Sequence, residues 1–482
     1  MKRYYRFGCA LIVILLLAVI IYCAVNPVSG KREFMLLTES DEAALGAETD
    51  KEVVAQYGLY EDAQLQAYIE EIGLPMTKVT HRPNLNYSFK IVDTPVINAF
   101  AVPGGYVYFT RGILGYFNNE AELAGVLGHE LGHVSARHTA QQYSRAQLAQ
   151  LGLGVGMIFS EKFREYAGLA QFGVGLLFLR FSRDHERQSD DLGVEYSMKA
   201  GYDPEYMAEF FTTLERLHPE SGQNGLEGWF STHPNPTDRV AAVRNKKIEW
   251  QAKLPAKQLA VRRNEYLQHI NGITFGDDPR QGYVEANSFY HPQLKFTFPL
   301  PSGWQLMNTP TQVQLVSPKE DAAILFSLDQ ARNPATAAQG FIQGASASVQ
   351  SNDAITINGM SAQRVISDIQ SQEELLRVLS YFIQKDGQVY VFHGLSGQAL
   401  FANYNNDFSN TMGKFKNLSD PAKINVKPDK VMLKTVSAPS TLKGALLALG
   451  SAEEELEQIA ILNGMQLSDR VEKGTLLKTI TR

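Results

Sequence analysis

The sequence predicts a multidomain α+β protein: a mainly helical first domain with a small sheet, an α+β second domain and a small final module. At 482 residues, the chain has room for roughly three domains of about 150 residues each. The first half shows helical periodicity with few strand-like segments, whereas apolar and polar residues alternate beyond position 285. A polar stretch near 250–285 separates these two patterns. The expected parts are therefore 1–30, 31–255, 256–284 as a linker, 285–426 and 427–482.

The composition limits the chemistry. Hydrophobic residues make up 44% and charged residues 20%, which is typical of globular proteins. The formal charge of −6 argues against nucleic acid as a partner. The two cysteines, Cys9 and Cys23, both lie near the N-terminus. Any metal in the rest of the chain must therefore be held by histidines and carboxylates.

The N-terminal segment predicts export. Lys2, Arg3 and Arg6 precede an apolar run over about 8–25. A basic region before an apolar segment is typical of a signal peptide or a membrane anchor. Both alternatives place residues 31–482 outside the cytoplasm, so we expect a periplasmic protein that is either soluble or anchored to the inner membrane.

The first domain is expected to be mainly helical. Thr38 and Asp41 form a capping-box pattern, and Asn119 and Asp203 stand at further N-cap positions. Helices are predicted at 38–58, 61–73, 119–143, 183–199 and 204–217, and strands at 87–92 and 106–110. Residues 147–180 are Gly-rich and apolar and predict either a mobile lid or a buried helical hairpin.

The second domain shows strand signals. Alternating apolar residues mark 296–300, and the segments 375–385 and 388–395 flank Asp386-Gly387, a hairpin signal. Helices are expected near 336–349 and 398–416. The domain contains no convergent set of His, Asp or Ser residues, so we expect a noncatalytic binding or spacing role.

The segment His129-Glu130-Leu131-Gly132-His133 carries the chemistry. Residues four apart share one helix face, so both imidazoles can reach one ion while Glu130 projects beside it. A catalytic zinc ion needs a third protein ligand and a position open to water, whose pKa it lowers to about 7. Glu130 is placed to act as general base.

The third ligand is expected on another helix. Glu186, within 182–190, is the best candidate, and His185 is the rival. Asp190 lies one turn beyond Glu186, where it can accept an N–H from a metal-bound imidazole and fix its tautomer. A solvated acidic helix face is the alternative reading of this stretch.

Three motifs together resemble one family. They are His129–His133, the 182–190 stretch, and Ser231-Thr232-His233-Pro234 with Arg239. They resemble the zinc endopeptidase family that includes the CaaX prenyl endopeptidases and HtpX, and in particular its soluble periplasmic BepA-like branch. The resemblance covers roughly residues 35–250. It implies a gluzincin fold, with an active-site helix, a small sheet and a second ligand-bearing helix.

The resemblance also assigns roles. It implies one Zn²⁺ per chain held by His129, His133 and Glu186, with Glu130 as general base and Asp190 supporting a ligand. It suggests that His233 and Arg239 face the cleft, where they could stabilise the oxyanion of the tetrahedral intermediate. Two alternatives for His233 remain: it could fill the open position of zinc and keep the enzyme latent, or cap a surface turn.

Two further segments bear on the site. Asn98, Ala99 and Phe100 precede the strand at 106–110, and an exposed edge strand here could receive substrate as an added strand. An internal strand is the alternative. His138 lies nine residues after His129, about 180° around a continuous helix, so we expect it to serve packing only.

The C-terminal half carries weaker resemblances. The stretch 298–304 resembles the opening of PsbP-like domains. Residues 441–477 resemble a degenerate LysM-type βααβ module, which implies contact with peptidoglycan. This module begins with Ala438-Pro439-Ser440-Thr441 in place of the usual Gly-Asp-Thr, which argues against glycan binding.

These observations predict a zinc-dependent endopeptidase that acts on misfolded, unfolded or envelope proteins of the periplasm. Two other functions stay open. One is a chaperone or scaffold that holds envelope proteins with little turnover, and the other is a cell-wall zinc amidase.

Overall fold

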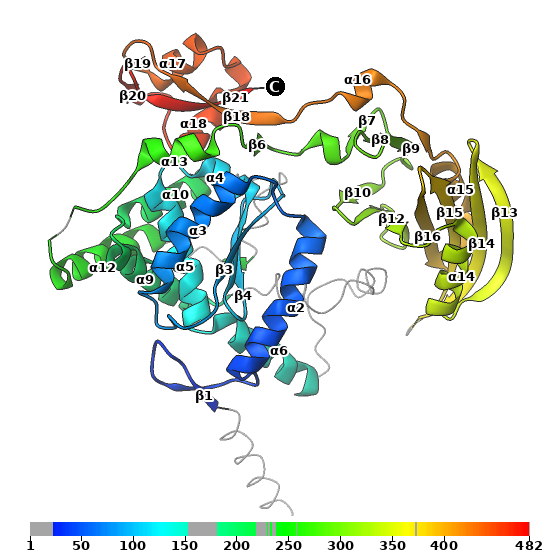
Figure 1. Cartoon of the computed structure of the whole chain (residues 1–482), viewed down its shortest axis with the longest axis horizontal. Coiled ribbons are helices and arrows are strands. Elements are labelled where there is room, and N and C mark those ends of the chain that lie inside the picture. The colour runs from blue at the N-terminus through cyan, green and yellow to red at the C-terminus, as the bar shows by residue number, and fades with distance from the viewer. Residues whose placement is uncertain are drawn as a thin grey trace, which may run out of the picture. The chain divides into compact units, whose positions relative to one another are not determined.

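The structure is a computed structural model that describes residues 23–152, 181–217, 229, 232–233, 238–256, 258–371 and 374–481. These residues form two compact units (Figure 1). The first contains the described residues up to Asp277 and those from Asp429 onward, and the second is Asp278–Pro428. The chain is thus a mixed helical and sheet protein of more than one domain, as the sequence predicts.

The first unit opens with a short hairpin and two capped helices. They are β1 (Cys23–Val25), β2 (Arg32–Phe34), α2 (Glu39–Tyr57) and α3 (Ala63–Thr77). The predicted capping box is present, because the Thr38 hydroxyl accepts the Asp41 N–H and the Asp41 side chain accepts the Thr38 N–H. Positions 1–22 of the expected export segment lie outside the described residues. Near its end, Asn26 is buried and donates to the Ala136 carbonyl at 3.2 Å.

A small sheet follows. Its strands are β3 (Ser88–Val92), β4 (Ala99–Val102) and β5 (Tyr106–Thr110), in the order β3-β5-β4, with β5 parallel to β3 and antiparallel to β4. Gly104 and Gly105 make the turn from β4 to β5 at positive φ, where only glycine is unstrained. This arrangement confirms the strands predicted at 87–92 and 106–110.

Helices pack against this sheet and form much of the rest of the unit. They are α4 (Arg111–Tyr116), α5 (Glu120–Ser135), α6 (His138–Gly152), α9 (Arg183–Ala200), α10 (Glu205–Leu217), α12 (Arg239–Lys253) and α13 (Arg263–Ile270). Every residue of α5 is buried, and α9 packs along it. A Cβ atom on Gly128 of α5 would lie 2.9 Å from the Gly193 carbonyl oxygen of α9, so glycine allows this close approach.

The helix predicted at 119–143 is interrupted. Helix α5 ends at Ser135, Arg137 has a φ of 60°, and α6 begins at His138. A tertiary contact holds this break, because the Arg137 guanidinium donates to Glu42 and to the Leu37 carbonyl. The prediction of one continuous helix was wrong, since those partners lie far away in the sequence.

The segment 256–284 differs from the expected linker. It contains α13 and β6 (Thr274–Phe275), and Tyr266, Leu267 and Ile270 are fully buried in the core of the first unit. The charged residues that suggested a linker occupy the other positions of this segment. Positions 153–180, with the lid or hairpin expected there, lie outside the described residues. No helix in the described ranges is long and apolar enough to cross a membrane.

The final module also belongs to the first unit. Its elements are β18 (Asp429–Thr435), β19 (Ser440–Thr441), α17 (Leu442–Ala448), η2 (Glu453–Glu455), α18 (Leu456–Leu462), β20 (Arg470–Val471) and β21 (Leu476–Thr481). Strands β19 and β20 pair across the two helices, and β18 pairs with β21 and β6. The Lys478 ammonium is buried and donates to the Gly115 and Phe117 carbonyls, both at 2.9 Å, so the module is fixed to the end of α4.

The second unit consists mainly of antiparallel sheet. Its elements are η1 (Pro279–Gln281), β7 (Tyr283–Glu285), β8 (Ser288–His291), β9 (Phe296–Pro299), β10 (Gln305–Asn308), β11 (Gln312–Val316), β12 (Ala322–Asp329), α14 (Pro334–Gly344), β13 (Ser348–Ile357), β14 (Met360–Gln370), β15 (Leu375–Lys385), β16 (Gln388–Gly397), α15 (Phe401–Met412), β17 (Lys416–Asn417) and α16 (Pro421–Ile424). One sheet has the order β10-β11-β12-β16-β15-β14-β13, and the other β17-β9-β8-β7. The predicted hairpin at Asp386-Gly387 is confirmed, with both residues at positive φ. The helix expected near 336–349 ends at Gly344, because Ser348–Ile357 pairs with β14.

Candidate metal centre

Two buried helices bring together the histidines and acids of the sequence motifs. His129, Glu130 and His133 lie on α5, and Glu186 and Asp190 lie on α9. The motif is helical because Asn119 caps α5 and Glu120 and Glu122 favour its N-terminal end. The close packing of α5 on α9 then places Glu186 opposite the two histidines.

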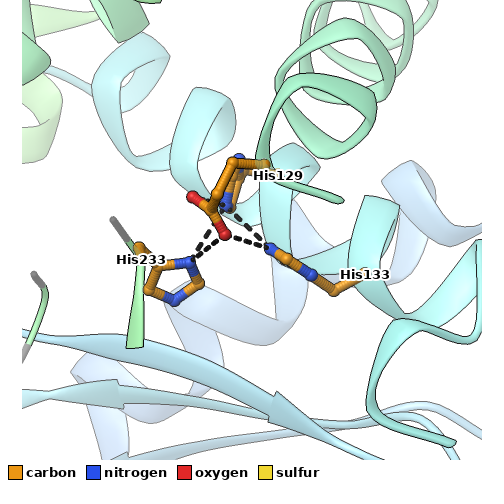
Figure 2. A group of neighbouring side chains, drawn as sticks. His129, His133 and His233 are labelled. Carbon is orange, nitrogen blue, oxygen red and sulfur yellow. Dashed lines mark hydrogen bonds and ion pairs between the residues drawn. The ribbon is translucent and has the colours of Figure 1, made fainter. Parts of the chain in front are cut away.

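Four donor groups meet at one point. One nitrogen or oxygen atom from each of His129, His133, Glu186 and His233 lies within 4.8 Å of the others, and all four side chains are buried. Figure 2 shows the three imidazole rings directed toward a common centre. The Nε2 atoms of His129 and His133 are 3.0 Å apart, and His233 Nδ1 lies 3.3 Å from His129 Nε2. Glu186 Oε1 lies 3.4 Å from His133 Nε2 and 3.1 Å from His233 Nδ1.

These separations fit a cation that is coordinated in tetrahedral geometry. Zinc–nitrogen bonds of about 2.0–2.1 Å at the tetrahedral angle separate the ligand atoms by about 3.3 Å. When Nδ1 of each α5 histidine carries its proton, two Nε2 lone pairs face each other at 3.0 Å. Such lone pairs repel unless a cation lies between them. The residues present therefore fit a divalent metal ion held by nitrogen and carboxylate donors.

Glu130 lies beside this donor group with both carboxylate oxygens free. It is fully buried, and neither Oε1 nor Oε2 has a hydrogen-bond partner among the described residues. Its Oε1 lies 3.7 Å from His233 Nε2. Burial raises the pKa of the Glu130 carboxyl above its ordinary value. A buried carboxylate without a hydrogen-bond partner is costly, so stability does not explain the position of this side chain.

Asp190 lies behind His129, as the sequence predicts for a supporting carboxylate. Its Oδ1 is 2.9 Å from His129 Nδ1, which leaves Nε2 facing the donor group. Burial opposes ionisation of Asp190, but the charge of Arg239 and the hydrogen bond from His129 hold the pKa of its carboxyl below the ordinary value.

Arg239 occupies a different place from the one expected. Its guanidinium is 2% exposed, donates twice to Asp190 and lies 3.9 Å from the centre of the Phe211 ring. It also lies 3.6 Å from Glu186 Oε2. This cation was expected in the cleft at the oxyanion, whereas it lies on the protein side of His129, where Asp190 neutralises it.

His233 takes part in the donor group itself. Its backbone N–H donates to the Trp229 carbonyl at 2.7 Å, and its ring stacks on Trp229 at 4.4 Å. The rival ligand His185 lies outside the donor group and stacks on His138 at 4.3 Å. The location of His233 could not be derived from local spacing, because it depends on contacts with His129 of α5 and Glu186 of α9, which lie far away in the sequence.

His138 is a neighbour of the donor group that the sequence pattern did not predict. His138 Nδ1 lies 3.0 Å from His133 Nδ1, and the His138 ring is fully buried. Burial lowers the pKa of His138 to about 3, so the ring is neutral. His138 lies outside the donor group, as expected, but the turn at Arg137 brings its ring beside His133, so the expectation that it serves packing only was wrong.

The expected substrate strand is an edge strand of the small sheet. Strand β4 pairs with β5 on one side, and it contacts α5. Ala99 and Phe100 are buried, and Phe100 stacks on Tyr108 at 4.8 Å. The Asn98 carbonyl accepts from Thr110. The side chains of Ala99 and Phe100 are thus used in packing. Because every residue of β4 is buried, this strand is an edge strand but not the exposed one that was expected.

A histidine pair one turn apart on a buried helix, a glutamate on a second helix and a free carboxylate between them define a metal-dependent hydrolase site. The family model described as "Peptidase family M48" matches residues 63–247. The chain is 30% identical over 243 residues to the mitochondrial metalloendopeptidase OMA1 of Schizosaccharomyces pombe, covering 48% of this chain and 67% of that protein. The chain belongs to peptidase family M48.

Two bacterial relatives are also similar to part of this chain. The chain is 30% identical over 220 residues to the "Beta-barrel assembly-enhancing protease" of Yersinia pestis, covering 44% of each protein. Its counterpart in Escherichia coli K12 is 27% identical over 230 residues, covering 46% of each. The chain therefore spans less than half the length of these two proteases.

Two solved structures resemble part of the chain. The PsbP protein of Synechocystis sp. PCC 6803 has a TM-score of 0.24 and 10% identity, covering 28% of this chain and 96% of PsbP. LpqN of Mycobacterium tuberculosis has a TM-score of 0.22 and 16% identity, covering 26% of this chain and 83% of LpqN. At these TM-scores the likeness supports no functional conclusion, and the LysM-like reading of the final module stays a prediction.

Proposed function

We propose that this protein is a zinc-dependent endopeptidase that cleaves misfolded or envelope proteins in the periplasm. The observation that carries the proposal is the buried group of His129, His133 and Glu186 with the free Glu130 carboxylate beside it. One Zn²⁺ held by these ligands would act as a Lewis acid and lower the pKa of a water molecule to about 7. Nitrogen and carboxylate donors in tetrahedral geometry suit zinc among the common metals.

Glu130 is the proposed general base. Its buried carboxylate has no hydrogen-bond partner among the described residues, so it can accept a proton from the attacking water and deliver it to the leaving amine. It lies on α5 between the two ligands, so the same rigid helix fixes its distance from both. Asp190 and Arg239 orient His129 from behind, and this role replaces the oxyanion role expected for Arg239.

For His233, the geometry favours the role of a fourth ligand. Its Nδ1 lies 3.1 Å from Glu186 Oε1 and 3.3 Å from His129 Nε2, which is the spacing of the donor group itself. As a fourth ligand, His233 would exclude water from the ion, so we propose a latent state in which His233 blocks the site. Replacing His233 by alanine then raises peptidase activity, whereas a role at the oxyanion predicts a loss of activity. An unchanged rate would refute both roles.

The substrate is proposed to be an extended polypeptide. Strand β4 begins at Ala99, and the Asn98 carbonyl before it already accepts from Thr110. An added strand would therefore pair with the main chain of β4 from Ala99 and Phe100 onward, which gives broad specificity. The names of the bacterial relatives and the basic, apolar N-terminal segment support envelope proteins as the substrates. Inner-membrane anchoring and peptidoglycan contact through 427–482 are further proposals from the sequence.

The test is proteolysis by the purified full chain. Casein digestion should require zinc, stop on addition of a chelator and return with added zinc, while metal analysis should find one zinc ion per chain. A chaperone or scaffold would instead bind unfolded protein without cleaving it, and binding would persist in Glu130→Gln. A wall amidase would release fragments from peptidoglycan and leave casein intact. Either outcome would overturn the proposed function.

A further inference from the structure

The nitrogen of His133 that faces away from the donor group also has a partner. His133 Nδ1 lies 3.0 Å from His138 Nδ1. On its far side, His138 Nε2 lies 2.9 Å from Gln188 Oε1, on α9. His138 is 0% exposed and His133 is 1% exposed, so water does not substitute for these contacts.

Only one direction of hydrogen bonding along this chain of groups is compatible with a metal ligand. For His133 Nε2 to offer its lone pair, the proton of that ring must lie on Nδ1. His138 Nδ1 must then accept a hydrogen bond from this N–H. The proton of the His138 ring therefore lies on Nε2, which donates a hydrogen bond to the Gln188 side-chain oxygen. The opposite direction would put a proton on His133 Nε2 and prevent coordination.

The geometry links both α5 ligands to α9. His129 is held directly by Asp190 at 2.9 Å. His133 is held through His138, which contacts Gln188 and also lies 3.2 Å from the Ser189 hydroxyl. Helix α9 therefore carries one ligand, Glu186, and orients the other two. The left-handed turn at Arg137 makes this possible, because it brings His138 beside His133.

We propose that His138 is a positioning residue for the metal centre: it accepts the Nδ1–H of His133 and is itself oriented by Gln188. This inference rests on the proposed function in one respect, because it takes His133 as a metal ligand. Partners of this kind commonly change metal affinity about 10- to 100-fold when they are removed.

Two replacements separate hydrogen bonding from packing. His138→Phe keeps a flat ring against His185 and Phe181 but removes both nitrogens, whereas His138→Asn removes the ring but keeps an acceptor near the Nδ1 position. Zinc affinity is measured on the full chain by competition with a chromophoric chelator. We expect His138→Phe to bind zinc about 10- to 100-fold more weakly than the wild-type chain. The fold-loss in zinc affinity of His138→Asn should be less than a third of the fold-loss of His138→Phe. Cobalt substitution should show an altered visible spectrum in His138→Phe alone.

The matched control is His269→Phe. His269 stacks on Tyr68 at 3.7 Å, outside the metal centre, so the same exchange there should leave zinc affinity unchanged. If His138→Phe keeps the wild-type affinity, or His138→Asn loses as much as His138→Phe, the inference is overturned. If either variant fails to fold, Gln188→Leu decides: weaker zinc binding supports the inference, and unchanged binding overturns it. If the wild-type chain binds no zinc, the proposed function fails first.

Discussion

The Arg239 guanidinium holds the Asp190 carboxylate through two hydrogen bonds, from Nε to Oδ2 at 2.8 Å and from Nη2 to Oδ1 at 2.6 Å. The same Oδ1 lies 2.9 Å from His129 Nδ1. Three helices, α12, α9 and α5, are therefore joined behind one imidazole. Because the pair is buried, each charge depends on the other for its stability.

Removing either Arg239 or Asp190 alone should lower the stability of the fold. Arg239→Met leaves the Asp190 charge buried without its partner, and we expect a loss of about 3–5 kcal/mol in the free energy of unfolding. The double variant Asp190→Asn, Arg239→Met should lose less than the sum of the two single changes, because no lone charge remains. Urea unfolding of all four proteins measures this coupling. Additive losses would show that the two side chains act independently.

Glu130→Gln should separate catalysis from metal binding. We expect peptidase activity to fall about 100- to 10,000-fold, because the glutamine cannot accept a proton. Zinc content should stay the same, since Glu130 is not in the donor group, and stability should not fall, since a buried charge is removed. Glu249→Gln, an exposed position on α12, is the control and should leave activity unchanged. Retention of activity in Glu130→Gln would assign the base to another residue.

Removing the metal should destabilise the first unit. An ion that binds only the folded state adds about 2.7 kcal/mol to the free energy of unfolding when its free concentration is 100 times Kd. A chelator should therefore lower the melting temperature, and zinc should restore it. The same treatment of Glu186→Ala should have a smaller effect, because one ligand is missing. A melting temperature insensitive to chelator in the wild-type chain would argue against a metal at this site.

The contact between α5 and α9 should tolerate no side chain at Gly128. An alanine Cβ there would lie 2.9 Å from the Gly193 carbonyl oxygen and 3.1 Å from its Cα, so the helices must separate. We expect Gly128→Ala to lower the free energy of unfolding by about 1–3 kcal/mol. It should also weaken zinc binding, since the two helices carry different proposed ligands. A Cβ atom at Gly340 in α14 would have no neighbouring atom within 4 Å among the described residues. Gly340→Ala should therefore raise the free energy of unfolding by about 0.5–1 kcal/mol. Thermal unfolding and zinc titration measure both variants.

The second unit should lose stability in acid through His393. Burial lowers the pKa of His393 to about 4, where its ring stacks on Phe341 and its Nδ1 lies 2.8 Å from the Ser380 hydroxyl. Between pH 6.5 and 4, the unfolded chain binds a proton that the folded chain does not, so stability falls as the pH falls. His393→Phe should reduce this slope by at most about 1.4 kcal/mol per pH unit. Urea unfolding at several pH values tests the expectation, and an unchanged slope would contradict it.

Local signals predicted much of the fold. The Thr38 capping box, the Asn119 cap and the Asp386-Gly387 turn all appear where expected, because each depends on residues within a few positions of one another. The failures lie where distant contacts decide the backbone. Arg137 breaks the helix because Glu42 binds its side chain, and Ser348–Ile357 is a strand because β14 pairs with it.

In the candidate site too, local spacing predicted some positions and distant contacts decided the others. The spacing of His129 and His133 is a property of one helix, so the sequence indicated the candidate metal-binding face directly. The positions of His138, His233 and Arg239 relative to that face are not properties of any one element.

The sequence alone determined the helix that presents two imidazoles and a carboxylate, because a repeat of 3.6 residues per turn is set by the backbone. Only the tertiary structure decided what surrounds them. It placed Arg239 on Asp190, His138 on His133 and His233 within the donor group. The physical reason is that burial leaves each of these polar groups to find a partner within the protein, and those partners come from segments that are far apart along the chain.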